Sequence, residues 1–321
     1  MLPSVLQVGQ VLNNRYCVHS YLAQTMYSTT YIAYDTHIQG KYWVLKEINL
    51  SYFSDRECAM AIQYLKNEGA RLNSLEHTCM PRMAEFFPMA RNFCILREYM
   101  PGKDLAYRLT TERVLPEPEI LSVGIQLCDF IDYLQTKNFL QTVSINNRIK
   151  LSNLVMRDDG KLSMLNVGFP TVDRLFNDYI EDHGYAPPEF FTGTPTTESK
   201  MTVYMVGALL YHLFSGLNPA TSTFRLPPLE NVRQGLSTPT KATIEKAIRP
   251  DPRDRYASLA DLRNGLIKSY QTAAKKAGIK NKPAYMDRDL SGPPSWLWLM
   301  TVIMLFVLGG SLFAAYQIFL R

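Results

Sequence analysis

The pattern of apolar and polar positions divides the first 270 residues of the chain into predicted strands followed by predicted helices. Residues 15–35, RYCVHSYLAQTMYSTTYIAYD, alternate as a pair of strands does. Residues 58–77 carry apolar residues at helical spacing, and a second helix is predicted over residues 118–135. The pattern therefore predicts a β-rich first part and a helical second part.

A different pattern covers residues 296–320, WLWLMTVIMLFVLGGSLFAAYQIFL, which contain no charged side chain. About 25 residues at about 1.5 Å of rise per residue reach roughly 37 Å, enough to cross the hydrocarbon core of a bilayer. Trp296, Trp298 and Tyr316 lie near the two ends of this run, where amphipathic rings favour the membrane interface. A buried core helix is the alternative, but such helices are rarely apolar on all faces over this length. We therefore predict a single transmembrane helix.

The residues on either side of this run predict its orientation. Residues 271–295 are polar and contain Gly292-Pro293-Pro294, which is typical of a flexible juxtamembrane linker. Arg288 and a lysine cluster precede the run, and only Arg321 follows it, so the positive-inside rule predicts a cell-membrane protein whose large N-terminal part is cytoplasmic. With a net charge of only +5, the cluster suits a membrane flank better than a nucleic-acid site. Its members are Lys268, Lys275, Lys276, Lys280 and Lys282.

Composition adds two constraints. The chain has 321 residues, of which 46% are hydrophobic and 20% charged, so it is long enough for a folded two-lobed body. Its five cysteines include no C-x-x-C pair, which predicts reduced, mostly buried thiols rather than a metal site.

The most informative motif occupies residues 144–168, SINNRIKLSNLVMRDDGKLSMLNVG. It resembles the catalytic core of the protein kinase family, in which H-R-D-x-K-x-x-N is followed, after a short hairpin, by D-F-G. Lys150, Asn153 and Gly168 occupy three of the matching positions. Arg148 stands where the family has the catalytic carboxylate, and Asn166 stands where it has the carboxylate that holds magnesium.

These two replacements bear directly on phosphoryl transfer, which depends on positioning and charge neutralisation. Arg148 cannot accept the proton of a substrate hydroxyl, because a guanidinium stays protonated and has no acceptor. Asn166 offers a neutral carbonyl where magnesium prefers an anionic oxygen, so Asn153 and Asn166 are only weak candidate ligands. We therefore predict little or no catalysis and no required cofactor.

Two further motifs complete the resemblance in the first part of the chain. The glycine-rich loop of the family falls on Ala23, Thr25 and Ser28, so a plain β-hairpin is predicted instead of a phosphate lid. Residues 42–48, YWVLKEI, resemble the V-A-I-K strand of the family, and Lys46 resembles the lysine that meets the α- and β-phosphates of ATP. Glu68, in the predicted helix, lies at the position of its ion-pair partner.

Residues 94–105, CILREYMPGKDL, resemble the kinase hinge, whose backbone hydrogen-bonds adenine. The resemblance implies an ATP cleft that includes Glu98 and Met100, whereas the alternative is an interlobe connection without a ligand. Farther along, the resemblance implies a structural ion pair between Glu189, in YAPPE, and Arg255, in DPRDRYASLADL. Thr202 replaces the helix aspartate that braces the catalytic loop in the family.

The resemblance covers residues 10–270 and implies an α+β, two-lobed protein-kinase-like fold. The small β-rich N-lobe extends to about residue 99, and the helical C-lobe covers residues 100–270. The linker, residues 271–295, and the transmembrane helix, residues 296–320, follow.

Three functional hypotheses follow. The first is a membrane-anchored pseudokinase, a scaffold or regulator that binds an active kinase or another membrane protein. The second is an atypical active serine/threonine kinase in which Asp158 or Asp159 replaces the missing carboxylates, although both lie in a turn that leads away from the expected active centre. The third is nucleotide sensing, in which Lys46 and Asn153 support weak ATP binding and Arg148 contacts phosphate. The role of magnesium stays open.

Overall fold

The computed structural model describes residues 6–139, 149–167, 185–219, 226–280 and 283–287. It divides the chain into two compact units, residues 1–281 and residues 282–321. The described part of the second unit contains one short 3₁₀ turn, η4 (Ala284–Asp287). No helix among the described residues is long and apolar enough to cross a membrane. The predicted transmembrane helix, residues 296–320, lies outside the described residues and stays a prediction.

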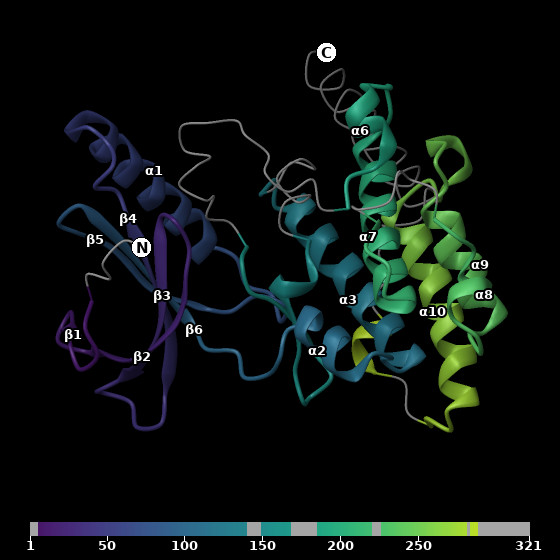
Figure 1. The fold of residues 1–321 in the computed structure, drawn as a ribbon, viewed down its shortest axis with the longest axis horizontal. Helices are drawn as coiled ribbons and strands as arrows, with labels where there is room; N and C mark the ends of the chain where they lie inside the picture. The colour runs from purple at the N-terminus through teal and green to yellow at the C-terminus, as the bar shows by residue number, and fades with distance from the viewer. Residues whose placement is uncertain (1–5, 140–148, 168–184, 220–225, 281–282, 288–321) are drawn as a thin grey trace, which may run out of the picture. The chain divides into compact units, whose positions relative to one another are not determined.

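The N-lobe contains an antiparallel sheet of six strands within the described residues (Figure 1). Its strand order is β1-β2-β3-β4-β6-β5, so β4 pairs with β6 and the chain returns to the edge through β5. The predicted strand pair and the strand after it are therefore present. The strands are β1 (Val11–Leu12), β2 (Tyr16–Gln24), β3 (Ser28–Asp35), β4 (Tyr42–Asn49), β5 (Met83–Met89) and β6 (Asn92–Glu98).

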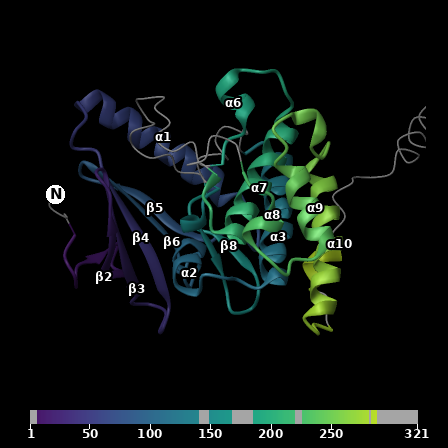
Figure 2. The same ribbon diagram turned by 45° about the vertical axis from the view of Figure 1, so that its right-hand side comes forward.

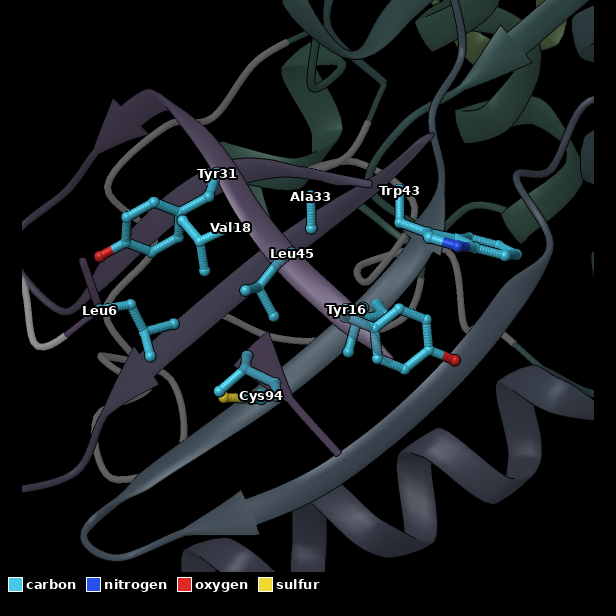
Figure 3. Packing of buried hydrophobic residues seen from close by; sticks show 10 residues of the cluster. Leu6, Tyr16, Val18, Tyr31, Ala33, Trp43, Leu45 and Cys94 are labelled. Carbon is cyan, nitrogen blue, oxygen red and sulfur yellow. The ribbon is translucent and has the colours of Figure 1, made fainter. Parts of the chain in front are cut away.

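Both faces of this sheet are packed, because side chains alternate between the faces along each strand. On one face, β1 and the segment before it cover a cluster that Figure 3 shows at close range. On the other face, Ile48 of β4 and Phe93 and Ile95 of β6 pack with Ala61 and Leu65 of α1 (Asp55–Asn73). The cluster in Figure 3 contains Leu6, Leu12, Tyr16, Val18, Tyr31, Ala33, Trp43, Leu45, Cys94 and Leu96.

Helix α1 begins three residues before the predicted start at residue 58 and ends four residues before residue 77. Its first turn is fixed by a capping box, in which the Ser54 side chain accepts the N–H of Glu57 and the Glu57 carboxylate accepts the N–H of Ser54. The apolar spacing identified the helix, and the side-chain cap determines where it starts.

The C-lobe is helical, and a small β-hairpin lies at its junction with the N-lobe (Figures 1 and 2). The helix predicted over residues 118–135 and the hairpin predicted around Asp159-Gly160 are both present. Gly160 has a positive φ of 75° at the turn of this hairpin. The elements are α2 (Leu105–Glu112), α3 (Glu117–Thr136), η1 (Leu151–Asn153), β7 (Leu154–Met156), β8 (Leu162–Met164), α6 (Pro188–Thr192), α7 (Glu198–Ser215), α8 (Leu229–Val232), α9 (Thr238–Ala247), η3 (Pro252–Asp254) and α10 (Leu259–Lys276).

Helix α10 extends beyond the predicted end of the folded domain at residue 270. Residues 271–276, which were predicted to belong to a flexible linker, are helical. Ala273 and Ala274 are buried there, and alanine has the highest helix propensity. A buried ion pair, from Arg263 Nε to Asp129 Oδ1 at 2.8 Å, joins α10 to α3. The linker prediction is therefore wrong for these six residues.

All five cysteines are free and buried, as their sequence spacing predicted. They lie in strands, helices and the segment between α1 and β5, and within the described residues no group of three or more His, Cys, Asp or Glu side chains is placed to hold a metal ion.

Helices α7 and α9 approach each other closely at Gly207. A Cβ atom added at this glycine would lie 2.7 Å from the Cβ of Ala247 and 3.0 Å from Cγ2 of Ile248. A contact this short to the Cβ of another helix cannot be relieved by rotating a side chain.

We expect Gly207→Ala to destabilise the protein by about 1–3 kcal/mol through overpacking. The change would raise helix propensity by about 1 kcal/mol, so propensity and packing act in opposite directions. Urea unfolding of the purified protein measures the net effect. Gly216→Ala, at a position with no atom within 4 Å but with a φ of 72°, separates backbone strain from overpacking. A more stable Gly207→Ala variant would contradict the close approach.

Candidate functional site

The turn between β2 and β3 lies where the family has its glycine-rich loop, and it is closed by its own polar groups. The N–H of Thr25 donates to the C=O of Ser28 at 2.8 Å, and the N–H of Ser28 donates to Thr25 Oγ1 at 3.2 Å. The two hydroxyls are 2.9 Å apart. A phosphate-binding loop needs backbone N–H groups directed at the ligand, and these two N–H groups are already used.

Lys46 and Ile48 are two residues apart on β4, so their side chains leave the sheet on the same face. Ile48 packs with α1, so Lys46 also lies on the α1 face. Glu68 of α1 pairs with Arg71 of the same helix, at 2.6 Å, rather than with Lys46. Arg71 also donates to the backbone C=O of Phe139 at 3.2 Å, and its guanidinium lies 4.9 Å from the centre of the Phe139 ring. The expected partner of Lys46 is therefore part of a contact between α1 and the C-lobe.

The predicted hinge, residues 94–105, begins within β6 and continues beyond its end at Glu98. The N–H of Glu98 donates to the C=O of Arg82 at 2.8 Å, and the Glu98 carboxylate accepts from Lys41 Nζ at 2.6 Å. The Glu98 side chain is thus occupied by an ion pair within the N-lobe. Among the described residues, no group accepts a hydrogen bond from the backbone N–H of Met100, so this hinge donor is available to a ligand.

Asn153 and Asn166 are brought together as a hydrogen-bonded pair. Asn166 Nδ2 donates to Asn153 Oδ1 at 2.8 Å. The backbone of Asn153 is fixed on both sides, because its N–H donates to the C=O of Lys150 at 2.9 Å and its C=O accepts the N–H of Leu165 at 2.7 Å. Asn153 is buried and Asn166 is exposed. Lys150 is half-buried at the start of η1, whereas Arg148 and Gly168 lie outside the described residues.

This donor set does not fit magnesium well. Both side chains are neutral, and the Asn153 carbonyl oxygen already accepts a hydrogen bond from Asn166. Magnesium in proteins is normally held by one or two carboxylates together with water and phosphate oxygens. Asp158 and Asp159, the proposed replacements, are exposed in the β7–β8 turn, where Asp159 accepts the N–H of Lys161 at 3.0 Å.

Thr202 is fully buried on α7, and its hydroxyl donates to the C=O of Glu198, one turn earlier in the same helix, at 2.9 Å. A hydroxyl used in this way serves its own helix. It does not supply the negative charge with which the family aspartate braces the catalytic loop.

The segment Tyr185–Glu189 is tied to the helices behind it by two contacts. Arg255 Nη1 and Nη2 donate to the two carboxylate oxygens of Glu189 at 2.6 and 2.7 Å, with both side chains buried. The predicted ion pair is therefore present. The Tyr185 hydroxyl lies 2.8 Å from Nδ1 of His212 on α7, and burial lowers the pKa of His212 to about 4.

Sequence reasoning did not select Arg97, which lies on β6 within the hinge motif of residues 94–105. It pairs with Val44 of β4 in the sheet register, and Lys46 pairs with Ile95 two residues away. Burial alone lowers the pKa of Arg97 to about 10. The signal in the sequence is an arginine directly after the apolar run Cys94-Ile95-Leu96.

Comparison with known proteins identifies the family. The protein kinase domain family matches residues 16–272, which cover both lobes. The chain belongs to this protein kinase family. The PknI kinase domain of Mycobacterium tuberculosis has a TM-score of 0.61 at 19% identity, with 83% of this chain and 100% of that one covered. PpkA-294 in its apo form gives 0.62 at 17% identity, covering 81% and 99%. These likenesses show the two-lobed kinase fold.

Curated relatives in the family are serine/threonine protein kinases from bacteria and eukaryotes. Serine/threonine-protein kinase PknA of Nostoc sp. is 24% identical over 275 residues, 80% of this chain and 48% of that protein. Serine/threonine-protein kinase TOUSLED of Arabidopsis thaliana is 28% identical over 225 residues, 65% of this chain and 32% of that protein. The chain thus spans less than half the length of these two kinases.

We expect acid to destabilise the kinase-like domain through His212. Because burial keeps its folded pKa near 4, below the unfolded value of 6.5, the unfolded chain binds this proton first as the pH falls. The neutral histidine contributes its full stability above about pH 6.5, and we expect about 2 kcal/mol to be lost between pH 6.5 and pH 4.

Urea unfolding at a series of pH values measures this loss. His212→Asn should flatten the profile in that window, whereas Tyr185→Phe, which keeps the imidazole, should retain the slope. Parallel pH profiles for wild type and His212→Asn would show that other groups carry the acid sensitivity.

Proposed function

We propose that this serine/threonine-kinase-family protein is a pseudokinase, a catalytically impaired signalling scaffold or regulator. The observation that carries the proposal is the 2.8 Å hydrogen bond from Asn166 to Asn153. The two positions that hold magnesium in active relatives meet here as neutral amides. Without an anionic oxygen at these positions, the charge on a moving phosphoryl group lacks its metal counter-charge.

Three further features support the same conclusion. The polar groups of Thr25 and Ser28 close the hairpin at the place of the phosphate lid. Glu68 is engaged with Arg71. Arg148, known from the sequence, replaces the proton acceptor with a permanent cation.

The alternative is an atypical active serine/threonine kinase. It is favoured by the relatives, which are named serine/threonine-protein kinases, and by the retention of Lys46, Lys150 and Asn153. It requires a carboxylate near the phosphates from elsewhere in the chain. Asp159 does not meet that need, because it forms ion pairs with Arg157 and Lys161 in its own turn.

The membrane belongs to the same proposal. A transmembrane helix over residues 296–320 would keep the domain at the cytoplasmic face of the cell membrane, where tethering raises the effective concentration of a protein partner such as an active kinase. The Arg255–Glu189 pair stabilises the C-lobe whether or not the protein is catalytic. An interaction module needs this stable shape and does not need catalysis.

We expect the purified full chain to transfer no γ-phosphate from radiolabelled ATP to itself or to a generic serine/threonine substrate protein, in magnesium or manganese. A bacterial serine/threonine kinase assayed in parallel is the positive control. Transfer that is lost in the Lys46→Ala variant would identify an active kinase and contradict the proposal.

We expect the double variant Arg148→Asp, Asn166→Asp to recover little or no activity. It restores both carboxylates but leaves the closed Thr25–Ser28 turn, the Glu68–Arg71 pair and the neutral Thr202 unchanged. The same radiolabel assay measures it, with thermal melting to show that the variant is folded. Robust autophosphorylation would show that these two positions alone limit catalysis.

A further inference from the structure

The positive charge of the chain is concentrated in and just after the C-terminal half of α10. Residues 264–286 contain five lysines and no Asp, Glu or Arg, a charge of +5. The whole chain also has a net charge of +5, so the remaining residues are electrically balanced. Segregation of charge on this scale indicates an anionic partner. The lysines are Lys268, Lys275, Lys276, Lys280 and Lys282, of which the first four lie in the described part of the chain.

The fold fixes two of these lysines on one face. Because residues 271–276 belong to α10, Lys268 and Lys275 are held on a single helix. Two residues seven positions apart on an α-helix differ by about 20° around the axis and lie about 10 Å apart along it. Both lysines are exposed, opposite the buried Ala273 and Ala274. Figures 1 and 2 show this end of α10, drawn in yellow, at the margin of the C-lobe.

The turn that ends α10 holds an apolar side chain among the lysines. The N–H of Gly278 donates to the C=O of Lys275 at 3.2 Å, and the N–H of Ile279 donates to the C=O of Ala274 at 2.9 Å. These are the two hydrogen bonds of a Schellman motif, and Gly278 supplies its positive φ, at 72°. In this motif an apolar side chain at the place of Ile279 frequently packs back onto the helix. Here Ile279 is 44% exposed and directly precedes Lys280.

The lysines differ in whether the fold uses them. Lys276 Nζ donates to the C=O of Gly235 at 2.7 Å and so joins the end of α10 to the loop before α9. The side chains of Lys268, Lys275 and Lys280 form no ion pair or hydrogen bond with another described residue. A cation in the last turn also complements the helix dipole, which is the structural alternative for Lys275. That role does not account for Lys268, two turns earlier, or for the exposed apolar side chain beside the cluster.

We propose that Lys268, Lys275 and Lys280 bind the anionic headgroups of a lipid bilayer, with Ile279 inserted between the headgroups. Lysines attract an anionic leaflet, and an apolar side chain among them adds burial at the interface. A nucleic acid would match the charge but would leave Ile279 in water. The contact would fix which side of the C-lobe faces the bilayer and so orient the domain for a protein partner.

The length of the chain that follows supports a bilayer as the partner. Trp296, the start of the predicted transmembrane helix, follows Lys280 by 16 residues. A segment of 16 residues spans at most about 55 Å in any conformation. A membrane anchor would therefore keep this end of α10 close to the headgroups and raise their effective concentration. The inference rests on the proposed function in this one respect, the transmembrane helix, and does not depend on the loss of catalysis.

The experiment uses the full chain in lipid nanodiscs of phosphatidylcholine, either alone or mixed with phosphatidylglycerol, which is anionic. Mass spectrometry measures the rate at which each lysine is acetylated. We expect acetylation of Lys268 and Lys275 to slow at least about fivefold in the anionic discs, because each cation near such a surface favours contact by about that factor. High salt should abolish the difference by screening the charges. Lys66, exposed on α1, should react equally in both discs.

A double variant tests the lysines themselves. Lys268→Gln, Lys280→Gln removes two of the three cations and leaves Lys275 as the reporter, which should lose most of its protection in the anionic discs. The matched control Arg56→Gln, Lys66→Gln removes the same charge from exposed positions on α1 and should leave Lys275 protected. All four side chains are exposed, so both variants should melt at the wild-type temperature. A role limited to the helix dipole would make Lys275 equally reactive in both discs.

Ile279→Ser keeps every charge and should also weaken the protection of Lys275, because it removes the apolar part of the contact. This effect distinguishes a bilayer from a nucleic acid. Protection by an added DNA duplex, without protection by anionic lipid, would assign the lysines to nucleic acid and overturn the proposal.

Equal acetylation in the two kinds of disc, protection that survives high salt, or full protection of Lys275 in the Lys268→Gln, Lys280→Gln variant would each overturn the proposal. A chain that does not enter the discs would contradict the transmembrane helix. The same acetylation measurement with preformed anionic vesicles then decides the lysine contact by itself. Phosphate transfer by the same preparation would overturn the proposed loss of catalysis and leave the lipid contact standing.

Discussion

The C-lobe depends on one buried guanidinium. Arg255 forms a bidentate pair with Glu189 and donates to the backbone C=O groups of Arg249, Lys200 and Pro250 at 2.7, 3.2 and 2.9 Å. One side chain therefore joins the start of α6, the start of α7 and the loop before η3. A buried charge is tolerated only where its hydrogen bonds are satisfied, and removing either partner of such a pair usually costs about 3–5 kcal/mol. This constraint preserves the kinase shape whether or not the chain transfers phosphate.

The same requirement, that a buried charge needs a partner, separates the structural ion pair of the C-lobe from the candidate site. Arg255 is paired because folding brings a carboxylate to it, whereas Arg97 lies between Val44 and Met83 in the sheet register. At the position where the resemblance places the magnesium-holding carboxylate, the chain has Asn166, which hydrogen-bonds to Asn153. Two neutral amides in contact do not offer the anionic oxygen that magnesium prefers, and this arrangement supports the proposed loss of catalysis.

Much of the fold follows from local pattern. Alternation predicted β2 and β3, the family resemblance predicted β4, and helical spacing indicated α1. Boundaries were less accurate where a side-chain cap or a buried alanine decides the end, as at Ser54 and Ala274. For the candidate site, the sequence identified which side chains are present but not their partners. Glu68 was expected beside Lys46 and is paired with Arg71.

The sequence alone determined the family, the change from a β-rich first part to a helical second part, and the presence of Arg148 and Asn166 in the catalytic motif, since these depend only on residue type and spacing. The tertiary structure decided that Asn166 donates to Asn153, and that Glu68 pairs with Arg71 rather than with Lys46. The physical reason is that a side chain chooses its partner from all the groups that folding brings within hydrogen-bond distance. Those groups come from segments far apart in the chain, so local pattern cannot identify them.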